Sequence, residues 1–200
     1  MFRIITSCLL ALFISLSLQG QTAGQATIKW LTWEEALEKN KVEKKKFMVD
    51  VHTEWCTWCK KMDAMTFQKD NIATFVNENF YAIKFDAEQK EDIIYDNKVY
   101  SYVSGFGKRG YHELAQEIMN GRMSYPTVVF IDPNLDVIQP IPGFQDARTF
   151  EIIINYFAGD YHTTTPWHRY EEGYKLGMPY VQPNIDPKSI QPAVQPVKNY

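Results

Sequence analysis

Two of the three cysteines in this sequence, Cys56 and Cys59, stand three positions apart within the run WCTWCK. Two intervening residues allow the second sulfur to reach the first. A thiolate at Cys56 would attack a substrate disulfide and form a mixed disulfide, and Cys59 would then release the product by thiol–disulfide exchange. The residue types and their spacing therefore predict a redox-active pair, Cys56–Cys59.

Structural explanations of the pair are weaker. A disulfide stabilises a fold chiefly by closing a long loop, and a bridge over two residues closes almost none. Zinc binding is the alternative, but a structural zinc site takes four ligands and commonly needs a second Cys or His pair. The sequence supplies no such pair among its histidines, which are His52, His112, His162 and His168. We therefore predict chemistry at the cysteines and no metal site.

The residues around the cysteines predict a buried strand that leads into a helix. Residues 47–51 are apolar except for Asp50, and Met62 and Met65 continue the expected helix as core residues. A cysteine at a helix N-terminus lies beside unsatisfied backbone N–H groups and the positive end of the helix dipole. Both favour the reactive thiolate at Cys56. An acid inside an apolar strand needs a partner or a task.

The rest of the pattern alternates helices and strands. Thr32 and Glu35 form a capping box that begins a first helix. The other expected elements are a helix at 72–76, a strand at 81–85, a hairpin of 93–95 and 99–103, a helix at 111–119, strands at 127–131 and 137–138 (the last antiparallel), and a helix at 150–157. This order predicts an α/β layer fold.

The composition is that of a globular chain. The 200 residues are 45% hydrophobic and 22% charged, with a formal net charge of -3. This is enough apolar material for one domain with tails. The sequence has no basic stripe of the kind that nucleic-acid binding requires, so no nucleic-acid partner is expected.

The first residues predict export. A basic start is followed by the apolar run 4–18 and then by small residues, which is typical of a secretory signal peptide. A retained anchor is the alternative, although the run is short for a membrane span. Cys8 lies within this run and would leave with the signal peptide. Export to an oxidising compartment favours disulfide chemistry.

With these motifs in place, the segment 47–67 resembles the active-site strand and helix of thioredoxins. It is more similar still to exported bacterial thioredoxin-like proteins that carry Trp-Cys-x-Trp-Cys-Lys. Asp50 stands where thioredoxins place a buried acid, and Lys84 matches the lysine that pairs with it. Tyr125-Pro126 matches the loop that holds a cis-proline opposite the cysteines.

The resemblance implies a thioredoxin fold of the α/β class, with a central mixed sheet flanked by helices and an insertion at about 88–124. It implies a thiol–disulfide oxidoreductase of the protein-disulfide reductase or isomerase type. The implied catalytic residues are Cys56, Cys59, Asp50 and Lys84, and the implied substrate-binding residues are Trp55, Thr57, Trp58, Tyr125 and Pro126. No cofactor is implied. The implied partners are disulfide-containing client proteins and a membrane-borne thiol electron donor, and a monomer is expected.

This interpretation divides the chain into a signal peptide at 1–20, a thioredoxin-like domain at 26–160 and a C-terminal extension at 161–200. The extension begins with an aromatic stripe expected to pack on the domain, and it ends in a proline-rich tail. Prolines at this density exclude a regular helix or central strand there. The expected location is the periplasm or the extracellular space.

Other interpretations stay open. A thioredoxin fold can hold clients without redox turnover, and the same cysteines could serve a disulfide-donating oxidase. Thr57-Trp58 replaces the Gly-Pro of thioredoxin, which leaves substrate choice undetermined. His52 and Glu54 flank the cysteines and could tune them. Residues 105–110 match G-x-G-x-x-G, but the βαβ unit that a dinucleotide site requires does not begin there, so a loop is expected.

Overall fold

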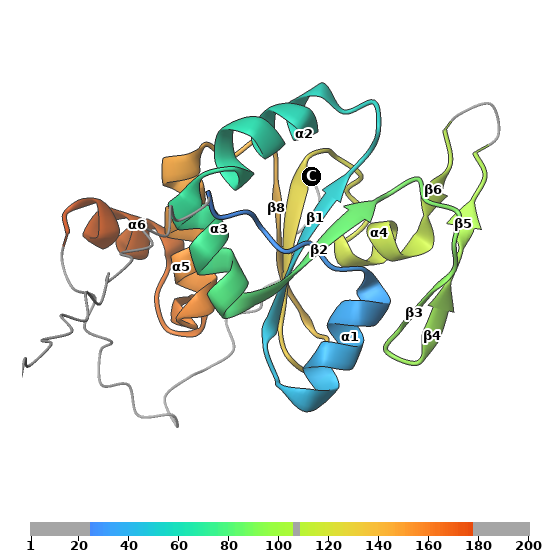
Figure 1. The fold of residues 1–200 in the computed structure, drawn as a ribbon, viewed down its shortest axis with the longest axis horizontal. Coiled ribbons are helices and arrows are strands. Elements are labelled where there is room, and N and C mark those ends of the chain that lie inside the picture. The colour runs from blue at the N-terminus through green and yellow to red at the C-terminus, as the bar shows by residue number, and fades with distance from the viewer. Residues whose placement is uncertain (1–24, 106–108, 178–200) are drawn as a thin grey trace, which may run out of the picture.

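A computed structural model describes residues 25–105 and 109–177, so the expected signal peptide and the tail 178–200 lie outside the described residues. Figure 1 shows the arrangement of the elements. Their bounds in chain order are α1 (Trp33–Val42), β1 (Lys46–His52), α2 (Thr57–Met62), a π-helical turn (Asp63–Phe67), α3 (Asp70–Asn79), β2 (Phe80–Asp86), β3 (Ile93–Tyr95), β4 (Lys98–Tyr100), β5 (Tyr102–Val103), β6 (Tyr111–His112), α4 (Glu113–Ile118), β7 (Thr127–Ile131), β8 (Val137–Pro142), α5 (Ala147–Ala158), a 3-10 turn (Tyr161–Thr163) and α6 (Trp167–Lys175).

The central sheet has four strands in the order β2-β1-β7-β8. β1 runs parallel to β2 and antiparallel to β7, and β7 runs antiparallel to β8. These are the order and directions of the thioredoxin fold. The expected fold class, an α/β structure with a mixed sheet flanked by helices, is therefore confirmed.

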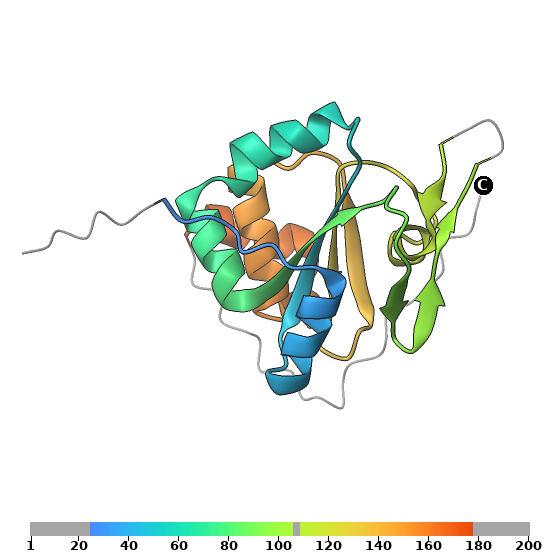
Figure 2. The same ribbon diagram turned by 45° about the vertical axis from the view of Figure 1, so that its right-hand side comes forward.

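Both faces of the sheet are buried, which explains why its central strands are nearly continuous apolar runs. Alternate residues of β1 face opposite sides, so Met48 joins one apolar cluster and Val49 joins the other. The first cluster lies under α2, α3 and α5, and the second lies under α1 and α4. Figures 1 and 2 show the two groups of helices on opposite sides of the sheet.

The predicted capping box begins α1. The backbone N–H of Glu35 donates to Thr32 Oγ1 at 3.2 Å, and the backbone N–H of Thr32 donates to Glu35 Oε2 at 3.0 Å. Each contact satisfies a backbone donor that the first helical turn leaves without an intrahelical partner.

We expect Thr32→Ala to lower the free energy of unfolding by about 1 kcal/mol, because alanine cannot accept the Glu35 N–H. Urea unfolding followed by circular dichroism measures this change. Thr74→Ala is the matched control, since Thr74 is an exposed residue inside α3. An equal loss of stability in both variants would contradict a capping role for Thr32.

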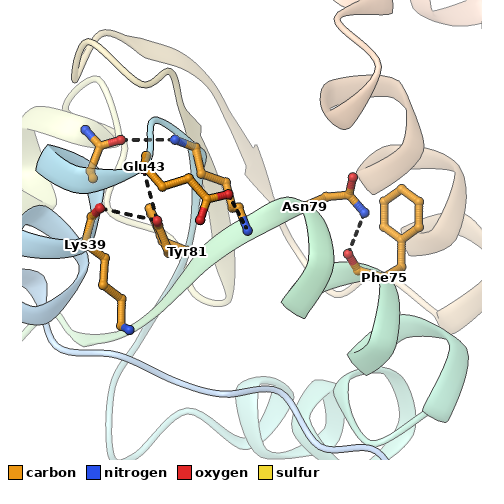
Figure 3. A network of polar contacts seen from close by, with 7 residues as sticks. Lys39, Glu43, Phe75, Asn79 and Tyr81 are labelled. Carbon is orange, nitrogen blue, oxygen red and sulfur yellow. Dashed lines mark hydrogen bonds and ion pairs between the residues drawn. The ribbon is translucent and has the colours of Figure 1, made fainter.

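The ends of α1 and α3 are tied near the start of β2. Figure 3 shows the Tyr81 hydroxyl between two carbonyl oxygens at the end of α1, 3.0 Å from that of Glu43 and 3.4 Å from that of Lys39. The Asn79 side-chain amide donates to the Phe75 carbonyl at 2.8 Å, one turn back in α3. These contacts satisfy last-turn carbonyls and fix where both helices meet the sheet.

The insertion folds as two short ribbons. The hairpin prediction is confirmed for β3 and β4, where Asp96 and Asn97 adopt positive φ values of 46° and 60°, as a two-residue hairpin turn requires. The predicted second strand, 99–103, is wrong in extent. It ends at Tyr100, and β5 pairs instead with β6. For the same reason the helix predicted from Tyr111 begins only at Glu113.

Three further details differ from the sequence prediction. β8 continues through Pro140 to Pro142. Proline has no backbone N–H to donate, but β8 is an edge strand and has a neighbouring strand on one side only, so prolines are tolerated there. α5 begins at Ala147 rather than at 150, capped by the Asp146 carboxylate. Met65 is 49% exposed and not a core residue, because the wider π-helical turn directs Thr66 and Phe67 inward instead. Met62 is buried as predicted.

The predicted aromatic stripe at the C-terminal end packs on α5. Tyr170 is buried, and its ring lies 5.0 Å from that of Tyr156, while the Trp167 ring lies 5.3 Å from the same tyrosine. The expected docking of this segment is thus confirmed as far as residue 177. Within the described part of the chain, no helix has both the length and the apolar character needed to cross a membrane.

Candidate functional site

The two cysteines lie where β1 gives way to α2. Cys56 is the N-cap of α2, and the backbone N–H of Cys59 donates to its Sγ at 3.0 Å. The two residues form a disulfide, and their relative exposures are 4% and 3%. When the bond is reduced, the same N–H and the helix dipole would stabilise negative charge on Cys56 Sγ. The predicted position of Cys56 at a helix start is confirmed.

An ion pair lies beside the cysteine helix. Asp50 and Lys84 are register partners on β1 and β2, and Lys84 Nζ lies 2.6 Å from Asp50 Oδ2. Lys84 also forms an ion pair with Asp63 of the π-helical turn. The predicted Asp50–Lys84 pair is confirmed, and Asp63 is a functional candidate that the sequence-based prediction missed. Its position four residues after Cys59, one helical turn along the same face, was the signal available in the sequence.

Burial shifts the pKa values of Asp50 and Lys84. Desolvation raises the pKa of Asp50 above its usual value, and the Lys84 ammonium offsets this only in part. Burial alone would lower the pKa of Lys84, but the carboxylates of Asp50 and Asp63 outweigh it and raise that pKa. Lys84 therefore stays charged at neutral pH, and Asp50 is the group able to exchange a proton.

The second carboxylate oxygen of Asp50 makes no hydrogen bond with Lys84 and is a candidate to accept a proton. Asp50 Oδ1 is buried and has no hydrogen-bond partner among the described residues. Asp50 lies on the same face of β1 as Met48, which shares an apolar cluster with Met62 of α2. The unpartnered oxygen is thus on the side of the sheet that α2 covers, where a buried acceptor would be costly without a function.

An exposed tryptophan and a half-buried tyrosine lie together next to Cys56. Trp55 is 48% exposed, and its ring lies 5.9 Å from that of Tyr125. The Tyr125–Pro126 bond is cis, as the resemblance predicted, and Pro126 is buried. Burial, with smaller contributions from Glu88 and Asp86, raises the pKa of Tyr125 to about 12, so its hydroxyl stays neutral. The contact brings the predicted loop beside the cysteine motif.

A second tryptophan, Trp58, lies in the first turn of α2 between the two cysteines in sequence. This side chain is 54% exposed, and its ring centroid lies 5.5 Å from that of Phe144. Lys61 Nζ lies 4.6 Å from the Trp58 ring centroid. Thr57, the residue between, is exposed at the first position of α2. Of the predicted substrate-binding residues, Trp55, Thr57 and Trp58 are therefore exposed, whereas Tyr125 is half-buried and Pro126 is buried.

Two residues of the insertion contact Trp55, and no pattern in the sequence indicates either of them. Trp55 Nε1 donates to Glu88 Oε1 at 3.0 Å, and the Arg109 guanidinium carbon lies 4.6 Å from the Trp55 ring. His52, a possible tuning residue by its place in the sequence, ends β1 with a buried Nδ1 that has no partner among the described residues. Glu54 is exposed in the loop before the cysteines.

The last glycine of the G-x-G-x-x-G match has a packing role. A Cβ atom at Gly110 would collide with the Tyr102 ring and the Val103 carbonyl on the paired strand. The residue before the match, Ser104, follows β5, which belongs to a two-stranded ribbon rather than a parallel βαβ unit. The described part of this segment therefore fits the loop that we expected, and residues 106–108 lie outside the description.

Sequence comparison finds relatives in animals. Spermatogenesis-associated protein 20 of Rattus norvegicus is 35% identical over 74 residues, which cover 36% of this chain and 9% of that protein. The Homo sapiens protein of the same name is 29% identical over 118 residues, which cover 58% of this chain and 13% of that protein. The matching region is thus only a small part of the length of these relatives.

Comparison with solved structures finds chains that share this fold, and two of them illustrate the similarity. A protein described as DsbH Oxidoreductase has 20% identity and a TM-score of 0.48, over 70% of this chain and 91% of that one. A thioredoxin from Thermus thermophilus has 16% identity and a TM-score of 0.49, over 66% and 87%. A family model matches residues 15–147, about two thirds of the sequence. This chain therefore belongs to the Thioredox_DsbH family, which is described as "Protein of unknown function, DUF255".

Proposed function

We propose that this protein is a thiol–disulfide oxidoreductase that reduces or exchanges disulfides in exported proteins. The observation that carries the proposal is the Cys56–Cys59 disulfide with Cys56 as the N-cap of α2. The buried Asp50, with one unpartnered oxygen among the described residues, adds a group suited to proton transfer. A purely structural disulfide would explain neither the short loop nor the buried acid.

The proposed reaction begins with the reduced protein. The Cys56 thiolate attacks one sulfur of a client disulfide, a new S–S bond forms, and the other client sulfur leaves as a thiolate that takes up a proton. Cys59 gives its proton to Asp50 and attacks Cys56 Sγ, which releases the second client sulfur. The second client sulfur leaves as a thiolate and takes up the proton that Asp50 received from Cys59. The protein ends as the disulfide and the client as a dithiol, so two electrons have moved to the client, with one proton from Cys59 and one from solvent.

Each further turnover requires a reductant. We infer a partner that carries a thiol pair and restores the Cys56–Cys59 dithiol, because nothing in the reaction itself supplies electrons. The signal-peptide pattern at residues 1–20 supports action in the periplasm or outside the cell, where protein disulfides persist. A membrane-borne donor would deliver electrons across the boundary of such a compartment.

We expect the purified protein to accelerate insulin reduction by dithiothreitol about tenfold or more, because a helix-start thiolate attacks disulfides faster than the free reagent. Precipitation of the insulin B chain follows the reaction. No acceleration would overturn the proposal and favour a client-binding module. A redox titration of the Cys56–Cys59 pair distinguishes a reductase from an oxidase. A reduction potential of about -270 mV supports a reductase, and one of about -120 mV supports an oxidase.

A further inference from the structure

We infer that the rim of the disulfide selects client segments in which acidic side chains flank the reacting cysteine. This inference rests on the proposed function, and it names the chemistry of the partner that the site would take. The rim consists of Trp55, Trp58, Tyr125 and Phe144 together with the cations that lie against them, Arg109 and Lys61.

A cation lies against each exposed tryptophan that borders the disulfide. The guanidinium of Arg109 lies 4.6 Å from the Trp55 ring, and Lys61 Nζ lies 4.6 Å from the Trp58 ring and 5.8 Å from that of Phe144. Contact with a ring face is attractive because of the ring quadrupole, and it orders a long side chain that would otherwise be mobile. Both positive charges are thus held at the rim before a client arrives.

These cations have no counter-ion in the part of the chain that the structure describes. Within the described residues, neither Arg109 nor Lys61 forms an ion pair with a carboxylate, and both are exposed. The neighbouring acids are Glu54 in the loop before Cys56, Asp86 at the end of β2 near Tyr125, and Glu88, whose Oε1 already accepts from Trp55 Nε1. Lys60, beside Lys61, is a third exposed cation on this surface.

The insertion places Arg109 at this rim. Arg109 precedes Gly110, whose missing side chain lets the chain pass closely over the Tyr102 ring of β5. Lys90 Nζ also lies against this ring, 2.9 Å from its centroid. Figures 1 and 2 show the β5–β6 ribbon rising at the same end of the sheet as the start of α2. A segment far from Cys56 in sequence therefore supplies one wall of its surroundings.

The chemistry of the rim fits an acidic, partly apolar client segment. A guanidinium held over a ring can still offer its N–H edge, which would suit a carboxylate accepting two hydrogen bonds from Arg109. Lys61 offers a second positive charge beside Trp58 and Phe144. The aromatic rings would contact apolar parts of the segment between these charges. Charge complementarity of this kind governs partner choice and association rate.

The test uses short peptides whose central cysteine is capped as a 2-pyridyl disulfide and flanked on both sides by Glu, Gln or Lys. Cys56 of the reduced protein attacks the peptide sulfur, pyridine-2-thione leaves and absorbs light, and Cys59 then releases the peptide thiol. We expect the Glu peptide to react about three to ten times faster than the Gln peptide at low salt, and the Lys peptide to react more slowly. Added salt should reduce the difference.

Substitutions in the rim test which residues cause the preference for the Glu peptide. Arg109→Gln and Lys61→Gln should each shrink the preference for the Glu peptide over the Gln peptide. Gly110→Ala should shrink it as well, by displacing Arg109 without removing it. Arg169→Gln is the matched control, because Arg169 is an exposed arginine on α6, on the far side of the molecule from β5 and β6 (Figure 1), and it should keep the full preference.

The outcomes separate this inference from the proposed function. Equal rates with the Glu and Gln peptides would overturn the inference and leave the proposed function standing. A reduced protein that reacts with none of the peptides would instead remove the proposed function. A preference that all four variants retain would show that it arises elsewhere on the surface, and the role of the rim would be rejected.

Discussion

We expect Cys56→Ser to abolish disulfide exchange and Cys59→Ser to accumulate mixed disulfides with client proteins. Serine at position 56 removes the nucleophile at the start of α2, so no bond to the client can form. Serine at position 59 leaves that nucleophile in place but removes the thiol that would release the client. In the Cys56 variant the rate of insulin reduction should fall to that of dithiothreitol alone, because the nucleophile is absent.

The assignment of roles depends on the helix and not on exposure. Cys56 and Cys59 are almost equally buried, so accessible area alone does not show which sulfur meets the client. Cys56 is the N-cap, where free N–H groups stabilise a thiolate, whereas the N–H of Cys59 is itself one of those donors. The geometry therefore favours attack by Cys56.

Non-reducing electrophoresis and mass spectrometry measure the trapped species. The Cys59→Ser protein should carry clients bound through Cys56, and the double variant Cys56→Ser, Cys59→Ser is the control that should carry none. Trapping by Cys56→Ser instead would reverse the two roles. Insulin reduction that survives in Cys56→Ser would remove the enzyme proposal and support a module that binds clients without exchange.

The part of this site that sequence could predict is the part encoded by short-range pattern. The strand around Asp50, the helix start at Cys56 and the capping box at Thr32 all rest on residues within a few positions of one another. The pairing of Asp50 with Lys84 followed from the resemblance, since no local signal relates two strands. The buried strands were found because both faces of the sheet are covered, which makes their apolar runs continuous.

What sequence could not predict depends on contacts between distant segments. The pairing of β5 with β6 is set by packing of the insertion, and with it the position of Arg109 against Trp55. Glu88 reaches Trp55 Nε1 for the same reason. Met65 is exposed because a π-helical turn changes the helical phase, and nothing in the spacing of the apolar residues indicates such a turn.

The second large effect is expected at Asp50, whose replacement by Asn should slow release of the mixed disulfide about a hundredfold at neutral pH. Asp50 is 1% exposed, and its Oδ1 has no partner among the described residues. We therefore expect it to take the proton of Cys59, directly or through one water. Removal of a positioned general base costs about 10² to 10⁴ in rate. The first attack by Cys56 should proceed as before, because it does not need this proton.

The stability of the same variant should change with pH in a stated direction. Burial raises the pKa of Asp50 above 3.8, so the folded protein holds a proton there that the unfolded chain has lost. The contribution of protonated Asp50 to the stability of the folded protein is therefore complete below pH 3.8, and it is lost as pH rises through the raised pKa. Asn does not titrate, so the free energy of unfolding of Asp50→Asn should increase relative to the natural protein over that interval.

Whether Asp50→Asn is also more stable than the natural protein at neutral pH depends on Lys84. Removing one partner of a buried ion pair usually costs about 3–5 kcal/mol, because the other charge is left unpaired. Here Lys84 keeps its ion pair with Asp63, and its side chain is 25% exposed. The cost should therefore be far smaller than usual, and Asp50→Asn should be at least as stable as the natural protein at neutral pH, as measured by urea unfolding.

Asp63→Asn is the matched variant that separates the proton from the ion pair. It also takes one carboxylate from Lys84, but Asp63 is 38% exposed and lies at the outer end of the group. If Asp50 acts on the proton of Cys59, stopped-flow traces should show slow resolution in Asp50→Asn and nearly unchanged resolution in Asp63→Asn. The rate in the natural protein should also rise with pH as Asp50 ionises, and this dependence should disappear in Asp50→Asn. Equal resolution rates in the natural protein and in Asp50→Asn across neutral pH would leave Asp50 only a structural acid, held in place by Lys84.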